Sequence, residues 1–274
     1  MSAIPPPATR DSVLFVTLDS CRYDTFAAAD LPHMKGVGPL HCAQAPSYFT
    51  YGSHAAMFVG FTPGVGGLPR AFLNPKFAKV FKLSHAGFSV EEPAYALDGP
   101  TVVEGFRRLG FLTVGTGAVG WFDPDTDAGQ ALIRPFDRFR YIDTGRGGIE
   151  AQVAFVGEQL DGCAGDAFVF INAGETHVPY YHNGAPWDPD DNPCVPFQEQ
   201  DRAAECRARQ AACCAFVDAA LAPLIERFRG STILITSDHG DCWGEDGLWE
   251  HGVSHPATLT VPLVLRIRGE PVAA

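Results

Sequence analysis

Four short runs of apolar and β-branched residues stand out along the chain and predict buried strands. They lie at residues 12–18, 167–171, 232–236 and 262–267. Each run is nearly continuous rather than alternating, which is typical of strands covered on both faces in a parallel sheet. The first three runs are followed directly by polar residues.

Longer segments with apolar residues at helical spacing separate these runs. The predicted helices lie at residues 53–59, 75–83, 102–109, 148–160 and 198–228. Strands that alternate with helices favour a layered α/β/α fold with a mostly parallel central sheet. We expect a single domain over residues 1–274, with residues 1–11 as an N-terminal tail.

Residues 181–197 form the least regular segment and contain four prolines. A loop of this length inside a compact domain is usually functional or mobile. A plain surface connection is an equal alternative at this stage. We expect an active-site loop here.

The composition narrows the class of protein. The 274 residues are 46% hydrophobic and 19% charged, which excludes a disordered or fibrous protein. A net charge of −12 argues against binding to nucleic-acid phosphates and to anionic membranes. No apolar run approaches the ~20 residues that span a bilayer, and the N-terminus shows no secretory signal.

The eight cysteines have neither the spacing of a metal site nor that of a small disulfide framework. Scattered thiols of this kind are typical of reduced cytosolic proteins. We therefore expect a cytoplasmic protein with free thiols, and with neither a nucleic acid nor a membrane as its partner. The oligomeric state stays open.

Candidate chemistry begins directly after the strand at residues 12–18, where Asp19 and Arg22 lie. A carboxylate at a strand end is a ready metal ligand, and an arginine beside it can contact an anion. Open α/β sheets bind their ligands beyond the carboxyl ends of their strands. The alternative is that Asp19 or Ser20 only caps the following helix.

A second polar cluster contains Thr50, Gly52, Ser53 and His54. Ser53 opens an apolar helical segment, which places Thr50 at a helix N-terminus. Backbone N–H groups and the helix dipole favour an anion there, such as a phosphoryl group or an ionised hydroxyl. Ordinary helix capping is the alternative.

Two further clusters follow the strands at residues 167–171 and 232–236. The first contains His177, and a lone histidine in a loop is more often structural than functional. The second contains Asp238 and His239, with His251 further along. A carboxylate oxygen beside an imidazole nitrogen suits Zn²⁺ or Mn²⁺ better than Mg²⁺.

Taken in order, these clusters resemble the alkaline phosphatase superfamily, and in particular its sulfatase-like branch. LFVTLDSCRYDTF resembles the opening strand and metal aspartate of sulfatases, and APSYFTYGSHAAMFVGFTPG resembles their nucleophile block. ETHVPYY is similar to the block that supplies a substrate-contacting histidine. SDHGDCWGEDGLWEHG is similar to a block of phosphoethanolamine transferases and of phosphodiesterase-like members.

The resemblance implies one metal site and a nucleophile. Asp19, Thr50, Asp238 and His239 are expected to hold one divalent cation, with Zn²⁺ or Mn²⁺ favoured and Ca²⁺ or Mg²⁺ as alternatives. Thr50 is also the expected nucleophile.

The resemblance implies substrate contacts as well. His177 and His251 are expected to bind the substrate anion, and one of them to protonate the leaving oxygen. Arg22 and His54 are expected to contact the substrate, with His54 standing where the family carries an arginine. The residues expected to orient these groups are Glu175, Asp241 and His255.

The sequence also departs from the family pattern. Thr50 stands where sulfatases carry a cysteine, so no formylglycine can form and sulfate hydrolysis by the usual route is disfavoured. Ala173 stands where two-zinc members carry an acid, which favours one metal. The chain ends soon after VPLVLR, so we expect the C-terminal subdomain of the family to be reduced or absent.

We therefore predict a metal-dependent hydrolase of small-molecule phosphodiesters or phosphomonoesters that acts through a covalent phosphothreonine at Thr50. One alternative is a phosphotransferase that passes the group to an alcohol acceptor. Another is a sulfatase or phosphonate ester hydrolase. A third is a metal-binding protein that keeps the fold without catalysis.

Overall fold

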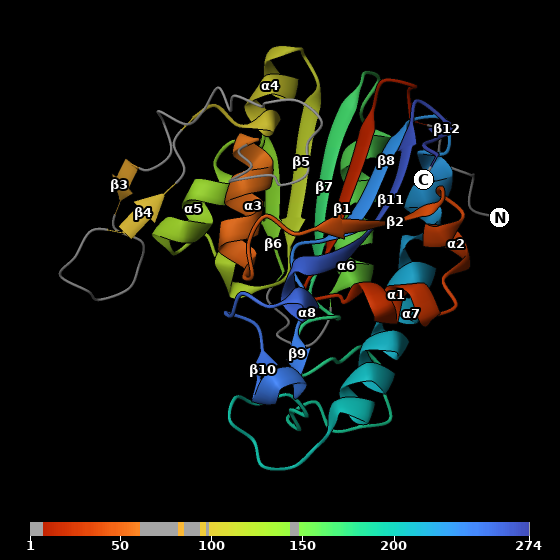
Figure 1. Cartoon of the computed structure of the whole chain (residues 1–274). Coiled ribbons are helices and arrows are strands. Elements are labelled where there is room, and N and C mark those ends of the chain that lie inside the picture. Colours follow the sequence, from red (N-terminus) through yellow and green to blue (C-terminus); the bar gives the residue numbers. More distant parts are fainter. Residues whose placement is uncertain (1–7, 61–81, 85–93, 97–98, 143–147, 274) are drawn as a thin grey trace.

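The computed structural model describes residues 8–60, 82–84, 94–96, 99–142 and 148–273. Figure 1 shows a central twisted sheet with helices on both of its faces. Residues 1–7 of the predicted tail lie outside the described residues.

Eight strands form the central sheet, in the order β12–β11–β8–β1–β7–β5–β6, with β2 paired to β11 beside this path. Their bounds are β1 Val13–Leu18, β2 Leu40–Gln44, β5 Leu112–Gly117, β6 Arg138–Tyr141, β7 Ala167–Ala173, β8 Thr232–Ser237, β11 Thr260–Ile267 and β12 Glu270–Pro271. Strands β8, β1, β7, β5 and β6 run parallel, whereas β11 runs antiparallel to β8, β2 and β12. The predicted fold class is confirmed.

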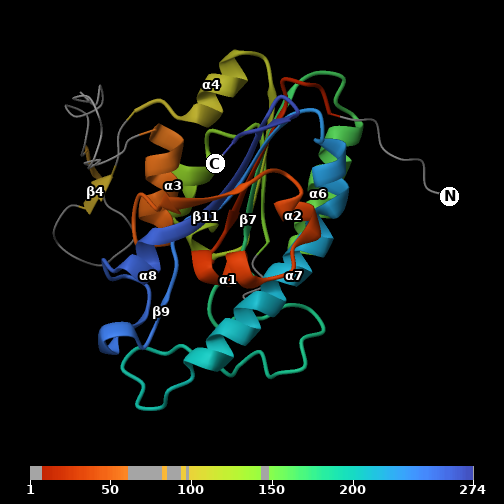
Figure 2. The same ribbon diagram turned by 45° about the vertical axis from the view of Figure 1, so that its right-hand side comes forward.

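Helices cover both faces of this sheet, as Figure 2 shows, with α6 and α7 on one side and α3 and α4 on the other. The bounds of the helices are α1 Tyr23–Ala28, α2 Pro32–Lys35, α3 Thr50–Val59, α4 Val102–Arg108, α5 Asp127–Ile133, α6 Ile149–Asp161, α7 Ala203–Arg227 and α8 Pro256–Leu259. Two short 3₁₀ helices lie at Gly120–Phe122 and Glu245–Gly247. A separate pair of short strands joins β3 (Lys82–Ser84) to β4 (Ala94–Ala96).

Strand β1 shows how the sequence builds the layers. Leu14 and Val16 lie in the hydrophobic cluster that includes residues of α6 and α7. Val13 lies in a second cluster on the other face, with Phe58 of α3 and Phe170 of β7. Because successive side chains of a strand point to opposite faces, a continuous apolar run is what a strand between two helical layers requires.

Some predicted elements differ from the structure. Helix α7 begins at Ala203 rather than at 198. The predicted helix at 75–83 lies mostly outside the described residues, and its last two positions belong to β3. Strand β5 escaped prediction because it contains Gly115 and Gly117, which rarely favour a strand. A Cβ atom at either position would lie within 2.5 Å of a phenylalanine ring carbon, so close packing explains the glycines.

Helix α7 is, among the described residues, the one that is long and apolar enough to cross a membrane by length and composition. Its most apolar window has a mean hydropathy of 1.3, and half of that window is buried inside the fold. Cys214, Val217 and Leu221 of this helix belong to the main core. A core helix passes the same test, and the packing of α7 is that of a core helix.

Candidate active site

The register of three parallel strands brings the predicted metal ligands to one edge of the sheet. Leu18, the last residue of β1, pairs with Ala173 of β7 and with Ser237 of β8. Asp19 and Asp238 follow these strands directly, so they leave the sheet side by side. The pairing of the strands therefore places Asp19 and Asp238 together at the carboxyl ends of the strands, where open α/β sheets bind ligands.

Asp19, Asp238 and His239 form a fully buried group that could hold a metal ion, called the metal group below. Atom Nε2 of His239 lies 3.8 Å from Asp19 Oδ1 and 3.5 Å from Asp238 Oδ2. The backbone N–H groups of Ser20 and His239 donate to Asp238 Oδ1. Asp238 Oδ2 has no hydrogen-bond partner among the residues that the structure describes. A bound cation would compensate this buried, unpartnered oxygen.

The electrostatics of the two carboxylates also fit a cation. Burial and the charge of Asp19 raise the pKa of Asp238 well above its usual value. Burial acts to raise the pKa of Asp19 too, but His177, His239 and His54 together lower it. Two buried carboxylates this close cannot both ionise without a positive charge between them. Two carboxylates and one imidazole nitrogen are a donor set that suits Zn²⁺ or Mn²⁺.

The ring of His239 is oriented so that one nitrogen remains available. Its Nδ1 donates to the carbonyl oxygen of Gly240 at 3.0 Å, so Nε2 keeps its lone pair. Burial lowers the pKa of His239 to about 4, which keeps the ring neutral near pH 7. Gly240 itself packs closely, because a Cβ atom there would lie 2.3 Å from the carbonyl oxygen of Ala257.

Thr50 is the first residue of α3, which places it at a helix N-terminus as predicted. The side chain is buried, with Oγ1 3.5 Å from Asp19 Oδ2 and 3.3 Å from His239 Nε2. The preceding residue, Phe49, makes no side-chain cap. The hydroxyl therefore lies beside the metal group at the positive end of a helix dipole.

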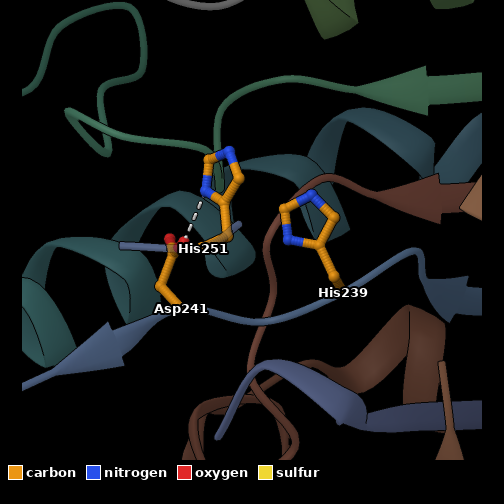
Figure 3. A group of neighbouring side chains, drawn as sticks. All are labelled: His239, Asp241 and His251. Carbon is orange, nitrogen blue, oxygen red and sulfur yellow. Dashed lines mark hydrogen bonds and ion pairs between the residues drawn. The ribbon is translucent and has the colours of Figure 1, made fainter. Parts of the chain in front are cut away.

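His251 and Asp241 lie beside His239, as Figure 3 shows, and these three residues form a second group that could bind a metal ion. Asp241 precedes β9 (Cys242–Trp243), and His251 follows β10 (Trp249–Glu250), which pairs with β9. His251 Nδ1 donates to Asp241 Oδ1 at 2.8 Å. The rings of His239 and His251 have centroids 4.5 Å apart.

A chain of side-chain hydrogen bonds supports Asp241. The Tyr180 hydroxyl donates to Asp241 Oδ2 at 2.7 Å, and Trp243 Nε1 donates to the Tyr180 oxygen at 2.8 Å. Burial acts to lower the pKa of His251, but the hydrogen bond and charge of Asp241 outweigh it and raise this pKa to about 9. The His251 ring is therefore protonated near pH 7. Its partner carboxylate is fully buried.

His177 lies close to His251, with ring centroids 5.1 Å apart. Its Nδ1 donates to the carbonyl oxygen of Val178 at 2.8 Å, so Nε2 is the remaining ring nitrogen. We call His177 and His251 the histidine pair. The structure thus brings together six predicted site residues: Asp19, Thr50, His177, Asp238, His239 and His251.

Arg22 does not have the free guanidinium that a substrate contact requires. Its NH1 donates to Glu245 Oε1 at 2.6 Å, and its Nε and NH2 donate to Asp24. The group also lies over the Trp243 ring, 4.3 Å from its centroid. With these partners, Arg22 connects the segment after β1 to the segment after β9. These contacts give Arg22 a structural position, and its contact with a substrate stays a prediction.

His54 is held by hydrogen bonds inside the protein. Its Nδ1 donates to the Thr50 carbonyl oxygen at 2.8 Å, and its Nε2 accepts from the Thr17 hydroxyl at 2.9 Å. The ring is fully buried beside Phe122 and Phe170, and burial lowers its pKa to about 4. Both ring nitrogens are used inside the protein, so His54 supports α3, and its predicted contact with a substrate stays a prediction.

The three predicted orienting residues have different positions. Asp241 contacts His251 as expected. Glu175 accepts from the backbone N–H groups of Gly148 and Ile149, so it caps the start of α6. His255 accepts from the Ala257 N–H at the start of α8. Glu175 and His255 therefore stabilise helix termini and do not contact the metal group or the histidine pair.

Asn172 is a site residue that sequence reasoning missed. Its Nδ2 donates to Asp19 Oδ2 at 3.2 Å, and Gln152 Nε2 donates to its carbonyl oxygen at 3.0 Å. It lies in β7, where it is the one polar side chain in a strand that is buried throughout. The signal available in the sequence was a single amide residue near the end of an otherwise apolar strand.

The loop at residues 181–197 contacts Tyr180, the residue whose hydroxyl donates to Asp241. Trp187 Nε1 donates to the Tyr180 carbonyl oxygen at 3.0 Å. Asp191 forms ion pairs with Arg202 and Arg209 at the start of α7. The loop therefore packs on the residues that support the histidine pair, and its role as an active-site loop stays a prediction.

The fold is shared with solved enzymes of the alkaline phosphatase and sulfatase-like superfamily. The zinc complex of the C-terminal periplasmic domain of EptC from Escherichia coli aligns with a TM-score of 0.64 at 14% identity, over 97% of this chain and 77% of that one. A phosphonate monoester hydrolase from Agrobacterium radiobacter aligns with a TM-score of 0.64 at 14% identity, over 94% and 68%.

A third example is the soluble domain of lipooligosaccharide phosphoethanolamine transferase A from Neisseria meningitidis. It aligns with a TM-score of 0.61 at 14% identity, over 98% of this chain and 81% of that one. No protein-family model and no curated protein matches the sequence. At these identities the comparison establishes the fold, in agreement with the resemblance found in the sequence.

The predicted cytoplasmic location is wrong by the same comparison. The Escherichia coli domain is periplasmic, and the Neisseria meningitidis domain is the soluble part of a larger transferase. These neighbours point to a location outside the cytoplasm. The sequence argument failed because eight unpatterned cysteines are weak evidence for a reducing compartment.

Proposed function

We propose that this protein is a metal-dependent phosphoryl-transfer enzyme in which Thr50 is the nucleophile. The observation that carries the proposal is the buried cluster of Asp19, Asp238 and His239 around the Thr50 hydroxyl, with Asp238 Oδ2 unpartnered. The neighbours support the same reaction class, because they are phosphoethanolamine transferases and a phosphonate monoester hydrolase.

Asp19, Asp238, His239 and Thr50 are the residues that would hold one divalent cation. When bound, the cation supplies Lewis-acid chemistry, lowering the pKa of a hydroxyl and polarising a phosphate oxygen. The zinc in the Escherichia coli EptC domain makes Zn²⁺ the first candidate here. Asn172 and Ser20 would hold Asp19 in position through hydrogen bonds to its two carboxylate oxygens.

Thr50 is placed to attack phosphorus and to form a phosphothreonine. Its hydroxyl has Asp19 Oδ2 and His239 Nε2 as acceptors, at 3.5 and 3.3 Å. The N-terminus of α3 stabilises negative charge at this position. Both acceptors belong to the metal group and are fully buried. The Thr50 hydroxyl is therefore oriented before the substrate arrives.

His251 is the best general acid in the site. Asp241 keeps Nδ1 as a donor and keeps the ring protonated, so Nε2 carries a proton that can be passed to the leaving oxygen. His177 also donates through Nδ1, to the Val178 carbonyl oxygen, so its Nε2 is the remaining ring nitrogen. The histidine pair can therefore present two ring nitrogens to a substrate.

A small-molecule phosphoester is the proposed substrate, and water is the proposed acceptor of the phosphoryl group. A transferase that uses an alcohol acceptor shares the first half of the reaction, and the phosphoethanolamine transferases among the neighbours favour it as the second candidate. Product analysis with and without an added alcohol separates the two.

Replacement of Thr50 tests the proposal. Thr50→Ala should abolish turnover of aryl phosphate monoesters and diesters while the protein keeps its fold and most bound metal. Thr50→Ser should retain part of the activity, because the nucleophile is kept. Thr126→Ala is the matched control: Thr126 caps α5 through its hydroxyl and lies outside the site. Wild-type turnover in Thr50→Ala would reject the covalent mechanism.

A further inference from the structure

Two cysteines that are far apart in sequence lie in contact, and one of them follows Asp19 by two residues. Sγ of Cys21 and Sγ of Cys214 are 3.5 Å apart, and the residues are separated by 193 positions. Both side chains are fully buried. Cys21 belongs to the segment that carries Asp19, and Cys214 belongs to α7.

Gln210 of α7 holds the backbone on both sides of Cys21, so the position of Cys21 does not depend on the thiol contact alone. Gln210 Nε2 donates to the Ser20 carbonyl oxygen at 2.9 Å, and the Arg22 N–H donates to Gln210 Oε1 at 3.2 Å. Cys214 follows Gln210 by about one helical turn, so both side chains lie on the same face of α7. The backbone of Cys21 is thereby held against that face.

We propose that Cys21 and Cys214 form a disulfide when the protein folds under oxidising conditions. A disulfide of a small thiol or of a protein oxidant accepts the electrons. The two cysteine S–H groups are oxidised to one S–S bond, and the oxidant is reduced to two thiols that take up the two protons. The two sulfur atoms, 3.5 Å apart in the structure, approach to about 2.05 Å in the disulfide.

The structural neighbours support a location outside the cytoplasm, where this oxidation can occur. Disulfides form and persist outside the cytoplasm, in compartments such as the periplasm. Because both thiols are buried in the folded protein, the exchange takes place while the chain folds. The proposal concerns the fold of the chain and is independent of the reaction at Thr50.

The adjacent residue Cys213 provides a test of the pairing. It is also buried, but it belongs to a different cluster, with Tyr180, Cys194 and Cys206, whereas Cys214 belongs to the main core with Cys21. Two neighbouring cysteines on one helix therefore face different surroundings. The structure assigns the link to Cys214 and not to Cys213.

The disulfide would fasten the segment that carries Asp19 to α7. A link across 193 residues restricts the unfolded chain strongly, since the effect grows with loop length. We expect the oxidised protein to unfold at a higher urea concentration than the reduced protein. The same link limits motion of the Asp19 segment relative to the sheet.

The experiment is refolding of the full-length, reduced chain in a buffer of reduced and oxidised glutathione. Remaining thiols are alkylated in denaturant without reductant, and the protein is digested with trypsin. We expect mass spectrometry to find the peptide at residues 11–22 linked to the peptide at residues 210–227. Reduction should separate these peptides and lower the urea midpoint.

Three variants assign the link, because the second peptide contains both Cys213 and Cys214. Cys213→Ser should keep the linked peptides and the reductant-sensitive urea midpoint. Cys21→Ser and Cys214→Ser should lose both. Full alkylation of Cys21 in the refolded wild type would overturn the proposal, as would a link that persists in Cys214→Ser. The wild-type result decides whether Cys21 is linked to α7 even where a variant does not fold.

Discussion

The metal group and the histidine pair are neighbouring parts of one site, but different forces hold them. Asp19 and Asp238 follow paired strands, so the register of the sheet fixes their backbones. His251 follows a two-residue strand and is held by the side chains of Asp241, Tyr180 and Trp243. Substitutions in the metal group should therefore abolish metal binding and strongly lower activity. Substitutions around the histidine pair should lower activity by smaller amounts.

The largest effect is expected at Asp238. In Asp238→Ala, one of two carboxylates in the metal group is lost, so bound metal should disappear and activity should fall strongly. Metal chemistry supplies several kcal/mol of transition-state stabilisation, so turnover should fall by about 10³-fold or more. Elemental analysis and turnover with an aryl phosphate check this. The control is Asp161→Asn, at an exposed carboxylate that pairs with Arg227.

His251 tests the other side of the comparison. His251→Gln should keep bound metal close to that of the wild type, because the metal group has its own ligands. Turnover should fall by about 10²–10⁴-fold for substrates with poor leaving groups, which need a general acid. With nitrophenyl esters the loss should be much smaller. Equal losses for both substrate classes would show that His251 has another role.

Asp241 should have a smaller effect that depends on pH. The Asp241 carboxylate raises the pKa of His251 to about 9, against the effect of burial, so the general acid is protonated below that pH and lost above it. Asp241→Asn removes the charge, so the decline of activity should begin at a lower pH. At neutral pH we expect about 10–100-fold slower turnover. An unchanged pH profile would show that Asp241 does not set the pKa of the general acid.

Arg22 should have the smallest effect on catalysis. Its guanidinium is already bonded to Asp24 and Glu245, so Arg22→Gln should leave KM for phosphoesters unchanged. The lost contacts should instead lower stability by about 1–3 kcal/mol. Urea unfolding and steady-state kinetics measure the two quantities separately. A large increase in KM with unchanged stability would restore Arg22 as a substrate contact.

The same contrast explains how much the sequence predicted. Continuous apolar runs indicated the buried parallel strands, and the polar residues directly after them indicated Asp19, Asp238 and His239 as one cluster. These inferences succeeded because strand register converts sequence position into spatial position. Thr50 followed from a helix start, which also has a local signal.

Side-chain partners could not be predicted in this way. Nothing local indicates that the Arg22 guanidinium is taken by Glu245, or that both nitrogens of His54 are used inside the core. The support of His251 by Tyr180 is equally non-local. Such contacts depend on how distant segments pack, so the substrate contacts that motif resemblance implies for Arg22 and His54 stay predictions.

Trapping of the covalent intermediate is the most direct test of the central claim. Metal-loaded protein is mixed with excess aryl phosphate, quenched in acid during turnover and digested for mass spectrometry. The account predicts a phosphoryl group on Thr50 in the quenched wild type, and none in a sample without substrate. Turnover in which Thr50 stays unmodified, or in which another residue carries the phosphoryl group, would contradict it.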